Sequence, residues 1–249
     1  MKVLTLAAGR GSRLEHQTET KPKCMTVVQN KPILYWQQKA QDLAGVNMKA
    51  AVLGYHAEQI KHYFQQTFIN EQWHQSNMVS SLLKADSIFQ REDVVISYSD
   101  IVYHPNDLLL LSQSAGDIVV AYDPNWLEQW KLRFDDPLSD AETLKLAGNK
   151  IIEIGCKPSN LDEIEGQFLG LIKVSEDGWS HIKNYLAKLS LAQIAKLDMT
   201  ALLQALVEEG VSIVACKVAH QWFEIDSIKD LNAADKLENL FEWSKENNG

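Results

Sequence analysis

The first half of the chain alternates between short apolar runs and segments with apolar residues at every third or fourth position. The first kind, such as Lys2–Ala7, is typical of buried strands, and the second is typical of helices. Pro32 fits the first position of a helix over Ile33–Ala44, and Gly45 fits its C-terminal end. Further strands are predicted over Lys49–Leu53, Asp93–Tyr98 and Ile118–Tyr122, and further helices over Ala57–Phe68, from a cap at Ser76 through Ala85, and over Asp107–Ser114. This alternation predicts an α/β fold with a mostly parallel sheet and helices on both faces.

The pattern changes near residue 123. Gly148-Asn149, between Glu142–Ala147 and Lys150–Gly155, is the signal of a two-residue hairpin turn. We therefore expect one domain over residues 1–249 with a small antiparallel insertion over approximately 123–175, a suitable place for substrate-binding side chains. The later elements predicted are strands over Phe168–Val174 and Val211–Val218 and helices over His181–Leu189, over Met199–Glu209 after a cap at Asp198, and over Ile228–Trp243.

Composition narrows the class of protein. A chain of 249 residues with 45% apolar and 23% charged residues is typical of one folded globular domain. The net charge of −9 argues against a nucleic-acid-binding surface, which needs a basic face. The three cysteines, Cys24, Cys156 and Cys216, are far apart and favour reduced thiols over a disulfide framework or a zinc site. No apolar stretch approaches the roughly 20 residues that cross a bilayer. We expect a cytoplasmic protein without a nucleic-acid or membrane partner.

The strongest chemical signal follows the first strand. Residues 6–14 read Leu-Ala-Ala-Gly-Arg-Gly-Ser-Arg-Leu, and residues 20–25 read Thr-Lys-Pro-Lys-Cys-Met. Gly9 and Gly11 leave room for backbone N–H groups to approach a base and phosphates. Arg13 and Lys23 would bring positive charge to a triphosphate. A glycine pair alone more often makes a simple tight turn, but the Lys-Pro-Lys that follows favours phosphate binding.

Other phosphate motifs fit this segment poorly. A P-loop needs Gly-Lys-Ser/Thr, which the segment lacks. A dinucleotide fingerprint needs a third glycine where Leu14 stands, so a dinucleotide-dependent oxidoreductase is disfavoured.

Residues 6–25 resemble the signature of the sugar-nucleotidyltransferase superfamily. Later segments resemble its phosphocholine and 2-aminoethylphosphonate cytidylyltransferase branch; they are residues 76–82, 97–103, 136–142, 154–155, 165–170 and 222–226. The resemblance covers nearly the whole chain. It implies a Rossmann-like fold and attack by an acceptor phosphate on the α-phosphorus of CTP, with release of pyrophosphate. The partners it implies are CTP and a small phosphorylated or phosphonate acceptor, bound in part by the insertion at 123–175.

The resemblance also implies roles for individual residues. Lys23 and Arg13 would be catalytic, with Lys23 stabilising the pentacoordinate transition state. Asn77 stands where the superfamily usually has a base-contacting glutamine, which favours the cytidylyltransferase branch. The implied nucleotide contacts are Leu6, Ala7, Ala8, Gly9, Gly11, Ser12, Arg13, Lys23, Asn77 and Ser99.

Two aspartates are candidate magnesium ligands. Asp100 follows a strand, and ligands of open α/β sheets bind beyond the carboxyl ends of strands. Asp226 follows the strand Val211–Val218 by a short loop. Two carboxylates plus a triphosphate would suffice for Mg²⁺. Asp226 alone would fit a helix cap equally well, but its pairing with Asp100 favours the metal.

Acceptor recognition has two candidate sets of residues. Trp130 and Trp222 could contribute to an aromatic box around a trimethylammonium group, although core packing explains each tryptophan singly. Asp140 and Glu142 could instead bind an amine, or belong to a solvated acidic loop. The acidic segment 136–142 resembles the aminoethylphosphonate enzymes more closely, which favours the amine.

Two rival functions stay open. One is a sugar-1-phosphate nucleotidyltransferase, and the other is a catalytically silent, nucleotide-sensing domain of the same fold. The presence of Lys23, Asp100 and Asp226 together argues against the silent domain, because a binder needs no metal at a leaving group. The sequence leaves the acceptor and the oligomeric state open, with a homodimer as one option.

Overall fold

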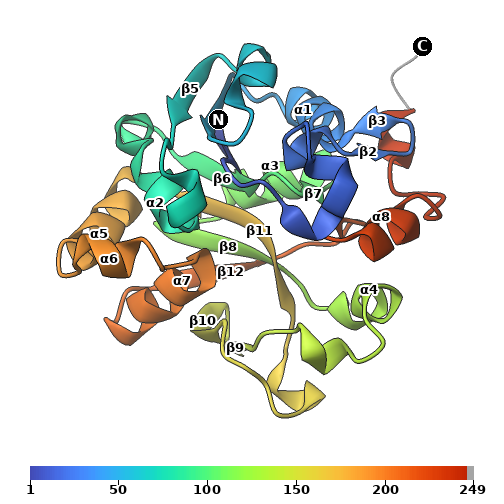
Figure 1. The fold of residues 1–249 in the computed structure, drawn as a ribbon. Coiled ribbons are helices and arrows are strands. Elements are labelled where there is room, and N and C mark those ends of the chain that lie inside the picture. Colours follow the sequence, from blue (N-terminus) through green and yellow to red (C-terminus); the bar gives the residue numbers. More distant parts are fainter. Residues whose placement is uncertain (246–249) are drawn as a thin grey trace.

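A computed structural model describes residues 1–245. Its centre is a nine-stranded sheet in which most strands point the same way (Figure 1). The strands run in the order β5 (Gln66–Ile69), β4 (Met48–Leu53), β1 (Lys2–Ala7), β6 (Val94–Tyr98), β11 (Gln167–Val174), β8 (Ile118–Asp123), β12 (Ile213–Lys217), β10 (Lys150–Ile154) and β9 (Leu144–Ala147). Strands β5, β4, β1 and β6 are parallel, and so are β8 and β12. Strands β11 and β10 run antiparallel to both of their neighbours.

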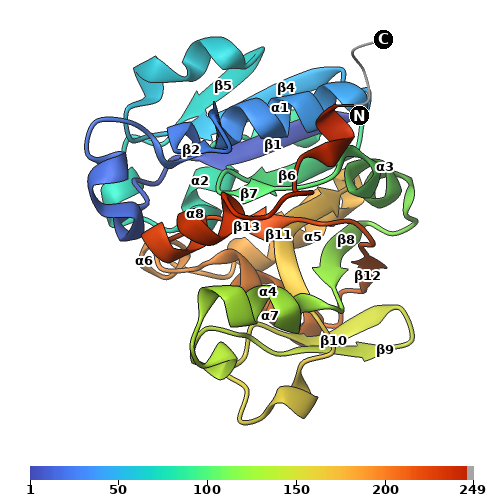
Figure 2. The same ribbon diagram turned by 90° about the vertical axis from the view of Figure 1, so that its right-hand side faces the viewer.

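Helices cover both faces of this sheet, as the sequence predicts (Figures 1 and 2). One core packs beneath α1 (Ile33–Leu43), α3 (Pro105–Gln113), α4 (Trp126–Arg133) and α8 (Ile228–Ala234). The other core packs beneath α2 (Met78–Leu83), α5 (Glu176–Leu186), α6 (Leu191–Ile194) and α7 (Met199–Glu208). Successive side chains of a strand point to opposite faces, so Val3 joins the first core and Leu4 the second.

Two predicted helices are wrong in part. Residues 57–68 form two short 3₁₀ turns, Ala57–Gln59 and Lys61–Tyr63, and then enter β5. Tertiary pairing with β4 prevails there over helical periodicity, because Gln66-Thr67-Phe68-Ile69 extends the parallel sheet. The last helix ends at Ala234, well before Trp243.

The C-terminal aromatics are used for packing instead of helix formation. Phe241 stacks on Trp36 of α1 with ring centroids 3.8 Å apart, and Trp243 packs edge-on against the same ring. The chain leaves α8 after Ala234, and the segment that follows brings both rings to Trp36.

The segment 123–175 contributes to the main sheet. Its hairpin forms as β9 and β10 around Gly148-Asn149. Its last strand, β11, lies between β6 and β8 in the middle of the sheet, and the helix α4 was not predicted from the sequence. The role of this segment in acceptor binding stays a prediction.

Candidate active site

Lys23 is the centre of a charged cluster at the carboxyl ends of the strands. Its Nζ donates to Asp100 Oδ2 at 2.6 Å and also to Asp226 Oδ1. Arg13 pairs with the other oxygen of Asp226. Four residues that the sequence singled out for catalysis or metal binding therefore meet at one point.

Short strands bring the two aspartates together. Strand β7 (Ile101–Val102) directly follows Asp100, and it pairs antiparallel with β13 (Phe223–Glu224). The backbone N–H of Ile225 also donates to the Asp100 carbonyl at 2.8 Å. This ladder places Asp226 beside Asp100, although the two are far apart in the sequence.

The cluster fixes the charge of Lys23. The lysine is buried, with 8% of its surface exposed. Burial by itself lowers the pKa of an ammonium group, but Asp100 and Asp226 outweigh that effect and raise the pKa of Lys23 above its ordinary value. Lys23 is therefore a stable cation, suited to stabilising negative charge and unsuited to accepting a proton near neutral pH.

Asp226 does not cap the terminal helix. Ser227 is the N-cap of α8, and its Oγ accepts from the N–H of Asp230 at 3.2 Å. The carboxylate of Asp230 completes a capping box by accepting from the N–H of Ser227 at 2.8 Å. The capping role that competed with metal binding is filled by neighbours, and the carboxylate of Asp226 faces Lys23 and Arg13.

Gly11 lets the side chain of Lys23 pass. It adopts a left-handed conformation with φ of 70°, and a Cβ there would lie 2.6 Å from Lys23 Cδ. Its carbonyl accepts from Thr18 Oγ1 at 3.1 Å, which fixes the loop. At Gly9, by contrast, a Cβ would meet no heavy atom within 4 Å.

The other predicted nucleotide residues lie at the end of β1, in the glycine loop, at the bend after β6 and at the start of α2. Leu6, Ala7 and Ala8 are buried, so ligand contacts at these positions would come from the backbone. Ser12 is exposed, and Ser99 is half-buried at the bend between β6 and β7. Asn77, rather than the predicted Ser76, is the N-cap of α2, and its Oδ1 accepts from the N–H of Met78 at 2.8 Å.

A cavity of about 250 Å³ opens beside the cluster. Arg13 and Asp226 form part of its wall, and the predicted acceptor residues Trp130, Asp140 and Glu142 form another part. The remaining lining is Met78, Tyr98, Arg133, Thr143, Ile154, Gly166, Gln167, Phe168, Asp198, Met199, Thr200 and Glu224. The structure thus joins three of the four predicted acceptor residues to the charged cluster.

Trp222, the fourth, lies behind this wall. It is buried, its Nε1 donates to Asp123 Oδ2 at 2.9 Å, and its ring lies 6.3 Å from that of Trp130. It lines a different cavity, of about 320 Å³, together with Asp123 and His220. Its part is to support Trp130 from the core, the packing role that the sequence left open.

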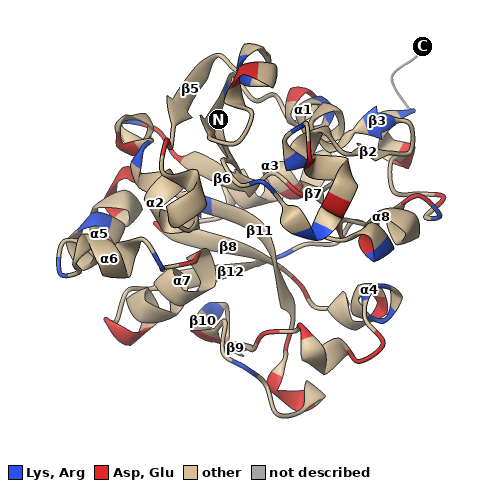
Figure 3. Cartoon of the chain, in the orientation of Figure 1, with Lys and Arg blue, Asp and Glu red and all other residues tan. Residues whose placement is uncertain are grey.

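The cavity is acidic. Acidic segments surround the part of the molecule that carries α4, β9 and β10 (Figure 3). Burial raises the pKa of Asp140 against the opposing charges of Arg133 and Arg13, and it also raises the pKa of Glu142, where the carboxylate of Asp198 acts in the same direction. Such a wall favours a cationic group on the ligand, because an ammonium would relieve both the burial cost and the repulsion.

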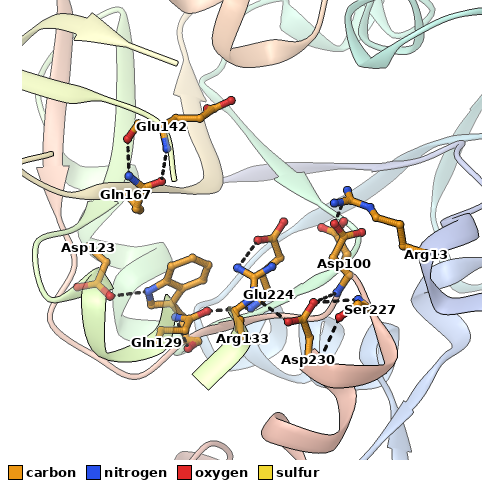
Figure 4. Close-up of polar contacts among 12 residues, drawn as sticks. Arg13, Asp100, Asp123, Gln129, Arg133, Glu142, Gln167, Glu224, Ser227 and Asp230 are labelled. Carbon is orange, nitrogen blue, oxygen red and sulfur yellow. Dashed lines mark hydrogen bonds and ion pairs between the residues drawn. The ribbon is translucent and has the colours of Figure 1, made fainter. Parts of the chain in front are cut away.

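Arg133 and Glu224 are residues that the sequence argument missed. Arg133 is almost fully buried, with its Nη1 2.7 Å from Glu224 Oε2 and its Nε donating to Asp230 Oδ1 at 3.0 Å (Figure 4). Burial, together with the carboxylates of Asp100 and Asp226, raises the pKa of Glu224 to about 7 against the opposing charges of Arg133 and Lys23. The signal that could identify Arg133 is a helix over residues 126–133, which places Arg133 one turn after Gln129 on the same helix face.

Two further absences concern the described part of the chain. Across residues 1–245, no three acidic, histidine or cysteine side chains are grouped so as to hold a metal ion. The same residues contain no helix that is long and apolar enough to span a membrane.

Known proteins resemble this chain in sequence and in fold. No family model matches it. CTP:phosphoglutamine cytidylyltransferase of Campylobacter jejuni is 35% identical over 247 residues, covering 93% of this chain and 98% of the relative. The inositol-1-phosphate CTP transferase of T. maritima superposes with a TM-score of 0.76 at 18% identity, over 97% of this chain and 96% of the other. CTP:phosphocholine cytidylyltransferase of Streptococcus pneumoniae gives a TM-score of 0.71 at 18% identity, over 94% and 97%. The fold is Rossmann-like, and the chain belongs to the cytidylyltransferases of the sugar-nucleotidyltransferase superfamily.

Proposed function

We propose that this enzyme uses Mg²⁺ to transfer CMP from CTP to a compact phosphorylated acceptor that carries an ammonium group, with release of pyrophosphate. The observation that supports it best is the contact of Lys23 with Asp100 and Asp226 at the edge of an acidic cavity. The cluster suits a triphosphate and a divalent cation, and the cavity suits a cationic headgroup.

The two aspartates fit a magnesium ion. Asp100 Oδ1 is buried and, within residues 1–245, has no hydrogen-bond partner, so this oxygen is available to a ligand. Carboxylate oxygens are ligands that Mg²⁺ prefers, and a pair of them suffices because water and phosphate oxygens supply the rest. Asp100 and Asp226 would hold the ion, which when bound would neutralise charge on the pyrophosphate leaving group.

The cations of the chain would act on the phosphates. An acceptor phosphate oxygen forms a bond to the α-phosphorus of CTP, and the bond from that phosphorus to the bridging oxygen breaks, so that pyrophosphate leaves with the electron pair. Lys23, kept protonated by its surroundings, would stabilise charge on the α-phosphoryl oxygens. Arg13, whose side chain is 70% exposed, can turn from Asp226 to the triphosphate.

The acceptor is best matched by an amine or amino acid. Asp140 and Glu142 provide carboxylates in the cavity wall, whereas Trp222 lies outside it. The C. jejuni relative acts on phosphoglutamine, and an amino acid of that kind carries an ammonium group. Tyr98 and Phe168 also line the cavity, so a quaternary ammonium such as choline is the competing headgroup.

One screen tests this proposal. Pyrophosphate release is measured with each of four NTPs against phosphoglutamine, phosphoethanolamine, 2-aminoethylphosphonate, phosphocholine and glucose 1-phosphate, with and without EDTA. We expect turnover with CTP and an amine-bearing acceptor, and none in excess EDTA. A preference for glucose 1-phosphate would identify a sugar nucleotidyltransferase. CTP binding without turnover on any acceptor would favour the silent domain.

A further inference from the structure

Asp230 connects Arg133, in the wall of the cavity, to Asp226, the proposed magnesium ligand. One of its oxygens accepts from Arg133 Nε at 3.0 Å. The other accepts from the backbone N–H of Asp226 at 3.0 Å and from that of Ser227 at 2.8 Å. Asp230 and Arg133 are 2% and 3% exposed, so these bonds are shielded from water. Figure 4 shows Asp230 between Arg133 and Ser227.

Helix α4 reinforces the same connection one turn away. Gln129 Nε2 donates to the Trp222 carbonyl at 3.2 Å, and its Oε1 accepts from the N–H of Glu224 at 3.2 Å. Residues 129 and 133 lie on one face of the helix because they are four positions apart. That face therefore holds both the strand that leads to Asp226 and the carboxylate that fixes its backbone.

We propose that Asp230 and Arg133 are positioning residues, which fix the backbone of Asp226 so that its carboxylate reaches the metal, and which couple this carboxylate to the acceptor cavity. This inference rests on the proposed function, since it takes Asp226 as a magnesium ligand. Residues that orient a metal ligand without touching the metal commonly contribute to the affinity of the site for that metal. The coupling follows because Arg133 and Glu224 themselves line the cavity.

The capping box supplies a matched pair of variants. Asp230→Asn leaves a single oxygen for the two backbone N–H groups and turns an NH2 donor toward the Nε–H donor of Arg133, so the side chain that holds the Asp226 backbone loses its own anchor. Ser227→Ala removes the cap on the N–H of Asp230 but leaves the contacts from Asp230 to Arg133 and to Asp226. Both variants should lower the Tm, whereas Asp230→Asn alone should change the metal site.

The measurement is calorimetric titration of Mg²⁺ into full-length protein saturated with a CTP analogue that has a methylene group between the α- and β-phosphorus atoms. We expect Asp230→Asn to weaken Mg²⁺ binding about 10–100-fold, and Ser227→Ala to leave it close to wild type. Arg133→Lys, which keeps the charge but cannot bridge Glu224 and Asp230 in the same way, should weaken Mg²⁺ binding and raise the acceptor KM. Equal Mg²⁺ affinity in Asp230→Asn and Ser227→Ala at similar Tm would overturn the positioning role.

Asp226→Asn in the same titration separates this inference from the proposed function. If Asp226→Asn leaves Mg²⁺ affinity unchanged, Asp226 is not a ligand and the metal assignment itself fails. If Asp226→Asn abolishes Mg²⁺ binding while Asp230→Asn does not alter it, the metal assignment stands and the positioning role fails.

Discussion

The two halves of this molecule differ in how their functional residues are brought together. The half built on β5, β4, β1 and β6 carries most of the proposed nucleotide residues and is called the nucleotide half; its glycine loop and Lys23 follow one strand within a single continuous segment. The half built on β11, β8, β12, β10 and β9 carries the proposed acceptor residues and is called the acceptor half; the cavity wall there includes residues of α4, the loop before β9, β11 and β13. The residues of the first site can therefore be found from one short sequence motif. The residues of the second site are far apart in the sequence, and only the fold brings them together.

The cluster of Lys23, Asp100 and Asp226 lies where the two halves meet. Lys23 comes from the motif, Asp100 from the end of β6, and Asp226 from beyond β13. The nucleotide half supplies the fixed cation, and the acceptor half supplies the carboxylate whose position depends on Arg133 and Asp230. Substitutions in the two halves should consequently affect different steps.

The largest effect is expected at the junction itself. Asp100→Asn and Asp226→Asn should each nearly abolish CMP transfer, because each replaces a charged candidate magnesium ligand with a neutral isostere. The check is pyrophosphate release together with thermal melting and a Mg²⁺ titration. Cooperative melting in Asp226→Asn is expected, since Ser227 caps α8. Full activity in either variant would remove that aspartate from the metal site.

Lys23→Ala comes next. Deleting one fixed charge that stabilises a transition state usually lowers kcat by about 10²–10³-fold. CTP affinity should fall less, because the backbone of the glycine loop remains. Single-turnover rates and CTP binding, measured on the same preparation, separate the two quantities. A near-normal kcat would show that the lysine of the motif has no catalytic part.

Two glycines allow a sharper test within the nucleotide half. Gly11→Ala forces a Cβ against the side chain of Lys23 at a left-handed φ, whereas Gly9→Ala adds a methyl group in open space. Displacing a catalytic group by about 1 Å can cost up to roughly 10²-fold in rate. We expect Gly11→Ala to lose kcat by at least about tenfold and Gly9→Ala to change it little. A larger loss in Gly9→Ala would instead place a ligand close to the Gly9 backbone.

The sequence predicts β1, the glycine loop and α1 of the nucleotide half well because their signals are local, but it predicts a helix over residues 57–68, which run into β5. Strand β1, the loop and helix α1 follow from apolar runs, glycines and a proline that are neighbours in the chain. The meeting of Asp100 and Asp226 could be anticipated from strand ends and from the family resemblance. The hydrogen bonds of Arg133 could not, because they depend on α4, which carries eight residues with a weak helical pattern. The sequence gives Trp130 and Trp222 the same candidate role. Only tertiary packing shows that Trp130 lines the cavity and that Trp222 packs behind it.

The smallest expected effect concerns the acceptor half and tests that separation. Asp140 lines the cavity, whereas Trp222 packs behind Trp130 with its indole bonded to Asp123. If the acceptor carries a primary ammonium, Asp140→Ala removes a charge-assisted hydrogen bond worth roughly 1.5–3 kcal/mol, which corresponds to an increase in acceptor KM of about tenfold or more. Trp222→Ala should instead lower the Tm, and any change in KM should be smaller and arise through a displaced Trp130. The measurement is acceptor KM for phosphoglutamine and for phosphocholine in both variants, with Tm measured alongside. A larger increase in KM for Trp222→Ala than for Asp140→Ala, at unchanged Tm, would mean that the aromatic ring and not the carboxylate reads the headgroup, and would point to choline.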